Sequence, residues 1–184
     1  MGKSVAVVEL SSVVIGYKIE DEMLKSSSVE LLLARTICSG KYLIVVGGSV
    51  SDIESARDTA LQLGKESVID SLVCSNVHPS VFQALGQSVM LSDKTPGALG
   101  IIETFSATSV LAAAHVAAQT ANVELFRIHL AMAMGGKGLA LMTGSVADVE
   151  AAIEAGAQEA RKRGLLVNSI VINNPSKELL TDYI

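Results

Sequence analysis

Apolar positions along the chain gather into short runs that predict paired β-strands. Residues 29–37 and 41–47 consist largely of Val, Leu, Ile and Ala, and the segment Cys38-Ser39-Gly40 separates them. Apolar runs of this length on either side of a Gly-containing turn are typical of a β-hairpin. Residues 123–133 and 138–143 show a second pattern of the same kind. We therefore expect two hairpins in this chain.

The second hairpin is part of a longer internal repeat. The tripeptide Val29-Glu30-Leu31 recurs 94 residues later as Val123-Glu124-Leu125. The tripeptide Gly48-Ser49-Val50 recurs 96 residues later as Gly144-Ser145-Val146. The two copies therefore differ by two added residues in the loop region between the hairpin strands.

A repeat at about half the chain length predicts two tandem domains in the 184 residues. We expect the first domain at residues 1–85 and the second at residues 98–184. The segment between them, residues 86–97, contains Asp93, Pro96 and Gly97 and is expected to be a linker.

Both copies show the same order of predicted elements. Each begins with a short strand, at residues 4–10 or 98–104, and continues with a helix, at residues 13–27 or 106–120. The hairpin follows. The later elements are helices from Ser49 to Gly64 and from Ser145 to Gly164, strands at residues 67–75 and 165–173, and short helices that open at Pro79 and Pro175.

The helix that follows each hairpin has a clear start signal. Ser49 and Ser145 each stand three residues before an aspartate, an arrangement that satisfies free amides at a helix N-terminus. The resulting order β-α-β-β-α-β predicts an α/β fold, a ferredoxin-like α+β sandwich with helices on one face of a mainly antiparallel sheet.

Composition adds an expectation about assembly. Hydrophobic residues make up 49% of the chain although aromatic residues make up only 3%. The excess lies in Ala, Val, Leu and Ile, which suit flat, closely packed surfaces between subunits as well as a core. We therefore expect an oligomer.

Net charge and hydropathy limit the classes of partner that we expect for this protein. The net charge is −5, and no cluster of Lys or Arg occurs, which argues against nucleic acid or an anionic membrane. No apolar run approaches the roughly 18–20 residues that a membrane span needs. The N-terminal residues do not resemble a secretory signal, so a cytosolic protein is expected.

No arrangement of residues predicts catalysis. His78, His115 and His129 are scattered along the chain, and the sequence contains no metalloprotease, nucleophile-elbow or phosphate-loop motif. Gly47-Gly48 and Gly135-Gly136 are best explained as strand-end and loop glycines. We expect no enzyme activity and no catalytic residue.

The two cysteines differ in context. Cys74 lies among apolar residues of a predicted strand and is expected to be buried. Cys38 lies at a loop tip beside Ser39 and Gly40. One thiol per chain cannot hold an iron–sulfur cluster, but three chains around a threefold axis would supply three. An ordinary loop cysteine remains the alternative.

The assembled motifs resemble a known family. These motifs are Asp21-Glu22-Met23-Leu24-Lys25 before Val29-Glu30-Leu31, then Gly48-Ser49-Val50, and finally His78-Pro79-Ser80. Together they resemble the bacterial microcompartment (BMC) shell domain, and the whole chain is similar to tandem-domain shell proteins of the trimeric iron–sulfur type from propanediol-utilisation compartments. The resemblance implies a homotrimer that imitates a hexamer, tiled edge to edge with other shell proteins around encapsulated enzymes, redox enzymes among them.

The resemblance also implies a central pore lined by the hairpin loops. The implied lining residues are Thr36, Ile37, Cys38, Ser39 and Gly40 of the first copy and Ala131, Met132, Ala133, Met134, Gly135 and Gly136 of the second. Thr36-Ile37-Cys38 followed by Gly40-Lys41 fits the iron–sulfur type, so Cys38 is the implied ligand of a [4Fe-4S] cluster shared by three chains. Ser39 stands where that type would have Pro.

The same resemblance implies a role for Lys25 at the edge of the tile, where the second copy has Gln119. The expected function is a shell tile whose cluster serves electron transfer or cluster exchange. Two alternatives remain open at this point. One is a tile with an open metabolite pore and no cluster, and the other is a soluble trimeric regulator built from ferredoxin-like repeats.

Overall fold

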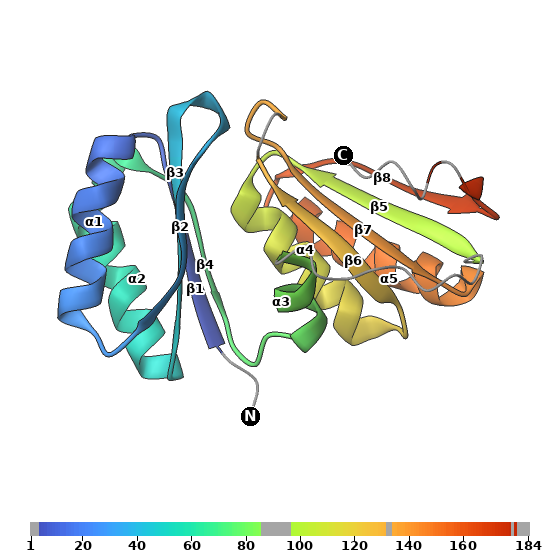
Figure 1. Cartoon of the computed structure of the whole chain (residues 1–184), viewed down its shortest axis with the longest axis horizontal. Coiled ribbons are helices and arrows are strands. Elements are labelled where there is room, and N and C mark those ends of the chain that lie inside the picture. Colours follow the sequence, from blue (N-terminus) through green and yellow to red (C-terminus); the bar gives the residue numbers. More distant parts are fainter. Residues whose placement is uncertain (1–3, 86–96, 132–133, 178, 180–184) are drawn as a thin grey trace. The chain divides into compact units, whose positions relative to one another are not determined.

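The computed structural model describes residues 4–85, 97–131, 134–177 and 179. The first repeat contains β1 (Ser4–Leu10), α1 (Val13–Ser26), β2 (Glu30–Ile37), β3 (Lys41–Gly48), α2 (Val50–Gly64), β4 (Val68–Cys74) and α3 (Pro79–Leu85). The second contains β5 (Ala98–Thr104), α4 (Ala107–Thr120), β6 (Glu124–Leu130), β7 (Gly138–Gly144), α5 (Val146–Lys162) and β8 (Leu166–Asn173) (Figure 1).

Each repeat forms its own four-stranded sheet. The strand orders are β2-β3-β1-β4 and β6-β7-β5-β8, so the first strand of each repeat is central, as predicted. β1 pairs antiparallel with β3 and β4, and β5 pairs antiparallel with β8. In register, Glu9 lies opposite Asp70 and Glu103 lies opposite Asn168. The predicted ferredoxin-like fold class is confirmed for both repeats.

The chain forms two compact units. The first comprises residues 1–77 together with the short segments 106–109 and 130–138, and the second comprises the remainder. Residues 86–96 of the expected linker lie outside the described residues. The expected domain limits, 1–85 and 98–184, stay a prediction.

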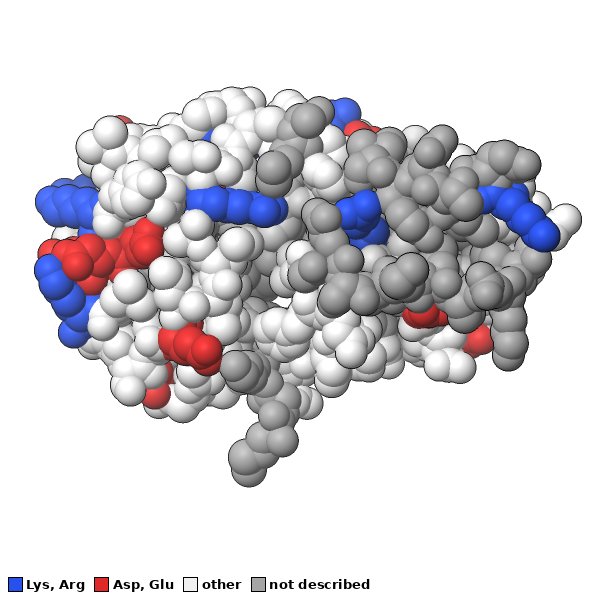
Figure 2. Space-filling model, viewed as in Figure 1, with Lys and Arg blue, Asp and Glu red and all other residues white. Residues whose placement is uncertain are grey.

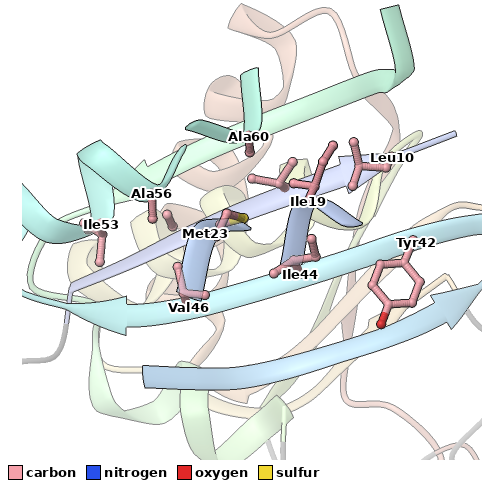
Figure 3. Close-up of a cluster of buried hydrophobic side chains, with 11 residues drawn as sticks. Leu10, Ile19, Met23, Tyr42, Ile44, Val46, Ile53, Ala56 and Ala60 are labelled. Atoms are coloured by element: carbon pink, nitrogen blue, oxygen red, sulfur yellow. The ribbon is translucent and has the colours of Figure 1, made fainter. Parts of the chain in front are cut away.

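The core of the first unit lies between its sheet and the helices α1 and α2. Ile19 and Met23 are four residues apart and therefore share one face of α1, and both side chains are buried. They meet Ile44 of β3 and Ile53 of α2 in one cluster (Figure 3). The helical spacing read from the sequence thus gives a single apolar stripe that covers the sheet.

One helix–strand contact in this core requires glycine. A β-carbon at Gly16 of α1 would collide with the ring of Tyr42 on β3. The Tyr42 hydroxyl donates a hydrogen bond to Glu20 Oε2 at 2.7 Å, which anchors the ring against α1. At the corresponding positions the second repeat has Val110 and Gly138, so the larger side chain has moved from the strand to the helix.

The predicted helix caps are present. The Ser49 hydroxyl accepts a hydrogen bond from the Asp52 amide at 3.2 Å, and the Ser145 hydroxyl accepts one from the Asp148 amide at the same distance. The aspartate carboxylates were expected to accept from free backbone amides at the helix start. Each accepts instead from the serine hydroxyl, at 2.5 and 2.6 Å. Ser49 and Ser145 are therefore the N-cap residues of α2 and α5, and their extended backbone sets where each helix begins.

The second hairpin is shorter than the sequence suggested. The apolar run continues to residue 133, but β6 ends at Leu130. Ala131 has a φ of 54°, a left-handed conformation that takes the chain out of the strand. Residues 132 and 133 lie outside the described part of the chain. Among the described residues, no helix has both the length and the apolar character needed to cross a bilayer.

Candidate functional site

The tip of the first hairpin is a tight turn. Ile37, the last residue of β2, pairs with Lys41, the first residue of β3, and Cys38–Gly40 form a single 3-10 turn between them. Ser39 and Gly40 have φ values of 68° and 70°. A proline cannot take this backbone conformation, because its ring holds φ near about −65°. The serine therefore fits a turn that the proline expected at this position could not form.

Cys38 lies at the start of this turn, where it is half-buried and not part of a disulfide. Its amide donates a hydrogen bond to the Ala131 carbonyl at 2.9 Å. Both residues belong to the first compact unit. The Ala131 carbonyl of the second loop thus holds the backbone of the first loop at Cys38. Ala131 itself is buried.

Other residues of the second loop also meet the first hairpin. A β-carbon at Gly136 would lie 3.2 Å from Lys41 Nζ and 3.8 Å from Ser39 Oγ, so glycine allows these side chains to approach. Gly135 is exposed and Met134 is half-buried, while Met132 and Ala133 lie outside the described residues. The structure thus brings the described parts of the two predicted loops together. Their role as a pore lining stays a prediction.

The two thiols have different chemistry. Cys74 is buried, and this burial raises the pKa of its thiol to about 11. The thiolate is the form that binds iron, so Cys74 is unsuited to be a ligand. Within the described residues, no three His, Cys, Asp or Glu side chains of one chain are placed to hold a metal. Of the two cysteines, the half-buried Cys38 is the better candidate ligand.

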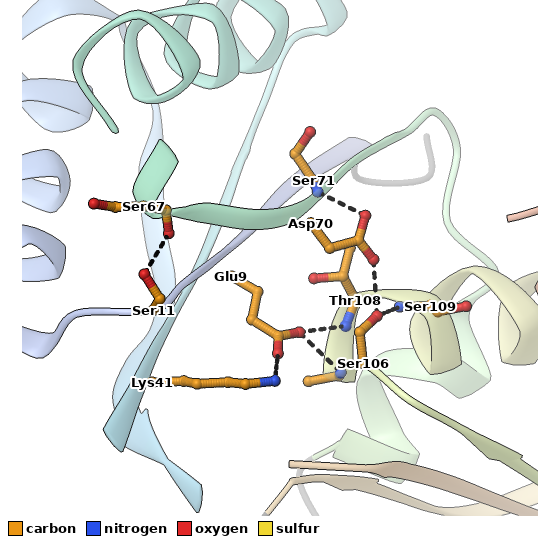
Figure 4. Close-up of polar contacts among 10 residues, drawn as sticks. Glu9, Ser11, Lys41, Ser67, Asp70, Ser71, Ser106, Thr108 and Ser109 are labelled. Carbon is orange, nitrogen blue, oxygen red and sulfur yellow. Dashed lines mark hydrogen bonds and ion pairs between the residues drawn. The ribbon is translucent and has the colours of Figure 1, made fainter. Parts of the chain in front are cut away.

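A buried polar network connects Lys41 of β3, Glu9 of β1 and the start of α4 (Figure 4). The sequence did not predict this network. Lys41 Nζ donates to Glu9 Oε1 at 2.8 Å, and Glu9 is fully buried. The other carboxylate oxygen of Glu9 accepts from the amides of Ala107 and Thr108 at 3.0 and 3.5 Å. These are the first two residues of α4, where a helix presents free amides and partial positive charge.

A second carboxylate completes the network. The Ser106 hydroxyl donates to Asp70 Oδ2 at 2.8 Å and accepts from the Ser109 amide at 2.9 Å. Ser106 therefore caps α4 and is itself held by β4 of the first repeat. The available signal in the sequence was Glu9, a charged residue near the end of an apolar strand, which recurs as Glu103.

Two of the scattered histidines do come together. The His78 amide donates to His115 Nδ1 at 3.2 Å, and His78 Nδ1 lies 2.8 Å from the Ser80 hydroxyl. Burial, followed by the nearby His78, lowers the pKa of His115 below its usual value. The contact joins the start of α3 to α4, and no group of three His, Cys, Asp or Glu side chains that could hold a metal occurs among the described residues.

Lys25 has a plain surface environment. Its side chain is exposed at the end of α1 and forms an ion pair with Asp21 one turn earlier. The hydrogen bond and charge of Asp21 raise the pKa of Lys25. On the described part of the face in Figure 2, Lys and Arg are interspersed with Asp and Glu. The edge role of Lys25 stays a prediction.

Comparison with known proteins identifies the family. The BMC domain model matches residues 4–77 and 98–175. The chain is 37% identical over 179 residues to the bacterial microcompartment shell protein PduT of Citrobacter freundii, a match that covers 97% of this chain and 96% of that protein. It is 29% identical over 174 residues to the carboxysome assembly protein CcmO of Synechococcus elongatus, covering 87% of this chain and 61% of that protein.

Solved structures show the same relationship. A microcompartment protein from Desulfitobacterium hafniense is similar with a TM-score of 0.86 and 38% identity, covering 98% of this chain and 99% of that chain. The fused permuted hexameric shell protein MSM0275 is similar in fold alone, with a TM-score of 0.66 and 19% identity over 87% of this chain and 82% of that chain. The names of these relatives describe shell and assembly proteins, which fits the expectation that this protein is not an enzyme. The chain belongs to the BMC domain family, as a tandem-domain shell protein of bacterial microcompartments.

Proposed function

We propose that three copies of this chain form a pseudohexagonal tile whose central pore is surrounded by the loops at residues 36–40 and 131–136. The tile lies edge to edge with other shell proteins around encapsulated enzymes, redox enzymes among them. Cys38 from the three chains binds a [4Fe-4S] cluster in the pore. When bound, such a cluster supplies one-electron chemistry or a cluster for exchange across the shell.

The observation that supports the cluster is the position of Cys38. It is the half-buried thiol at the tip of a hairpin, whereas Cys74 is buried with a raised pKa. The hydrogen bond from the Cys38 amide to Ala131 holds the ligand backbone in place before any metal arrives. Three loops of this kind around one axis would present three thiolates to a single cluster.

The turn that carries Cys38 also supports a pore. Ser39 and Gly40 place a hydroxyl and backbone polar groups at an exposed tip. Polar groups of this kind favour small polar solutes in an open pore. A cluster at the same place would close the pore and replace solute passage with electron transfer.

Anaerobic purification followed by iron and sulfide analysis tests the proposal. We expect a brown protein with broad absorbance at about 400 nm and about four iron atoms per three chains. Cys38→Ser removes the ligand and is expected to abolish the absorbance and the iron. Cys74→Ser is the matched control, since it removes the other thiol of the chain and should leave both unchanged.

The same experiment decides between the two shell alternatives. A trimeric protein that binds no iron after anaerobic reconstitution with ferrous iron and sulfide would contradict the cluster and favour the open metabolite pore. The third alternative, a soluble regulator, is disfavoured by the match with shell proteins over nearly the whole chain.

A further inference from the structure

Lys41 lies beside the cysteine turn, but its charge does not point into solvent. It is the first residue of β3, directly after the turn Cys38–Gly40, and its side chain is 17% exposed. A lysine near a loop tip usually extends its ammonium group into water. Lys41 Nζ instead donates to the fully buried carboxylate of Glu9 at 2.8 Å (Figure 4). The cation of this hairpin tip therefore lies inside the first unit.

The carboxylate that binds this cation is itself held in place. One oxygen of Glu9 binds Lys41, and the other accepts from the amides of Ala107 and Thr108. The carboxylate cannot rotate without losing one of these partners. A buried ion pair adds little net stability, because removing both charges from water has a large free-energy cost. What this pair does provide is one fixed position for the Lys41 ammonium group.

The second loop encloses the same ammonium group. Gly136 is buried, and a β-carbon there would lie 3.2 Å from Lys41 Nζ and 3.8 Å from Ser39 Oγ. The absence of a side chain at Gly136 thus lets the second loop approach both side chains. The second loop also accepts the hydrogen bond of the Cys38 amide, through the Ala131 carbonyl. The two loops therefore meet on both sides of the turn, at Cys38 and at Lys41.

Strand pairing connects the position of the ammonium group to that of the thiol. Lys41 pairs with Ile37, so the 3-10 turn between them begins and ends at positions that the sheet fixes. Cys38 directly follows Ile37, the buried last residue of β2. Because each residue of a short turn has only two soft backbone dihedrals, fixing Lys41 also limits the directions in which Cys38 can present its side chain.

We propose that Glu9 and Lys41 are positioning residues for Cys38. The ion pair holds the turn against β1 and the second loop, so that the thiol of each chain has one orientation when the shared cluster binds. This inference rests on the proposed function, because it concerns the same cluster, and it adds two residues that act through the ligand. Replacing residues that orient a metal ligand typically weakens metal binding by about 10–100-fold.

A neutral replacement of both residues tests the inference. The double variant Glu9→Gln, Lys41→Met removes the ion pair without leaving one charge buried alone, so the subunit is expected to remain folded. Met is unbranched like Lys, and the Gln oxygen can still accept from the α4 amides. Hydrogen exchange then measures whether the turn has lost its fixed position. We expect the amides of residues 36–40 to exchange about tenfold or more faster than in the wild type.

Cluster retention supplies the second measurement. After anaerobic reconstitution, the iron chelator bipyridine removes the cluster, and absorbance at about 400 nm follows the loss. We expect the double variant to lose its cluster about tenfold or more faster than the wild type. Lys41→Arg keeps the cation and its charge-assisted hydrogen bonding to Glu9, so its rate of loss should stay close to that of the wild type.

Further comparisons separate positioning from general stability. Lys18→Met makes the same chemical change at an exposed lysine of α1 and should leave both rates unchanged. All proteins are compared at equal intervals below their melting temperatures, so that a difference in global stability does not produce the effect. If the double variant does not fold, Lys41→Met alone takes its place, since Glu9 then keeps the two α4 amides as partners.

The outcomes separate this inference from the proposed function. Faster exchange and faster cluster loss in the double variant, with Lys41→Arg and Lys18→Met close to the wild type, support the positioning role. Wild-type exchange over residues 36–40 overturns it, and so does faster exchange with an unchanged rate of cluster loss. A wild type that binds no iron overturns the proposed cluster, whereas exchange in the cluster-free protein still decides whether the ion pair holds the turn.

Discussion

At the residue scale, the loop that carries Cys38 depends on backbone conformations that few residues accept. Ser39 and Gly40 are both left-handed, and only the glycine takes this conformation without cost. Ser39 therefore stores a small amount of strain at the proposed pore. Strain of this kind persists where the surrounding structure holds it, and here β2, β3 and the Ala131 carbonyl do so.

This conformation predicts a strong asymmetry between two substitutions at one position. Ser39→Pro should destabilise the protein by more than about 1 kcal/mol, because proline cannot reach the required φ. Ser39→Gly should be close to neutral, since lower strain offsets greater freedom of the unfolded chain. Denaturant unfolding at one fixed protein concentration would measure both. Equal stability of the two variants would show that the turn does not require a left-handed residue.

At the element scale, one position on the first helix and one on the second hairpin strand combine a small residue with a larger one in each repeat. In the first repeat Gly16 of α1 faces Tyr42 of β3, and in the second Val110 and Gly138 occupy these positions. The tyrosine ring also contacts Tyr17, with ring centroids 4.9 Å apart. The two repeats thus keep the same layers with different packing at one contact.

The close approach at Gly16 predicts a large effect from one methyl group. Gly16→Ala should destabilise the protein by about 1–3 kcal/mol, because the added carbon overlaps the Tyr42 ring and forces the helix away from the sheet. Gly48→Ala is the matched control, since its added carbon meets neighbours at 3.4 Å or more. Thermal unfolding of the two variants would measure the difference. A Gly16→Ala protein as stable as Gly48→Ala would contradict the packing argument.

At the scale of the whole molecule, the tile has to make two kinds of contact that can be separated by mutation. One kind lies within the proposed trimer, and the other joins neighbouring tiles, where we propose a role for Lys25 at the end of α1. Lys25 is exposed and paired with Asp21 in the single chain. Since the second repeat has Gln119 at the corresponding position, only alternate edges of the tile would carry the lysine.

Lys25→Ala is therefore expected to leave trimers intact and to reduce the sheets or tubes that electron microscopy would show in overexpressing cells. The reason is the loss of a long cationic side chain at the tile edge, where it would reach across to the neighbouring tile. Lys18→Ala removes another exposed lysine of α1 and serves as the control. Unchanged lateral assembly of Lys25→Ala would rule out the edge role.

The sequence by itself determined the repeat, the order of the elements and their sheet and helix faces. These features follow from local patterns, such as the four-residue spacing of Ile19 and Met23 or a serine three residues before an aspartate. Such signals involve residues that are only a few positions apart in the sequence, so these residues are neighbours in any structure that forms. The loop position of Cys38 followed from the hairpin pattern in the same way.

The tertiary structure alone decided which distant residues meet. Glu9 contacts the amide of Ala107, 98 positions away, and the His78 amide contacts the His115 ring, 37 positions away. No local pattern encodes such pairs, because they depend on how separate elements pack. The end of β6 at Leu130 was also decided there, since Ala131 leaves the strand and its carbonyl binds the Cys38 amide.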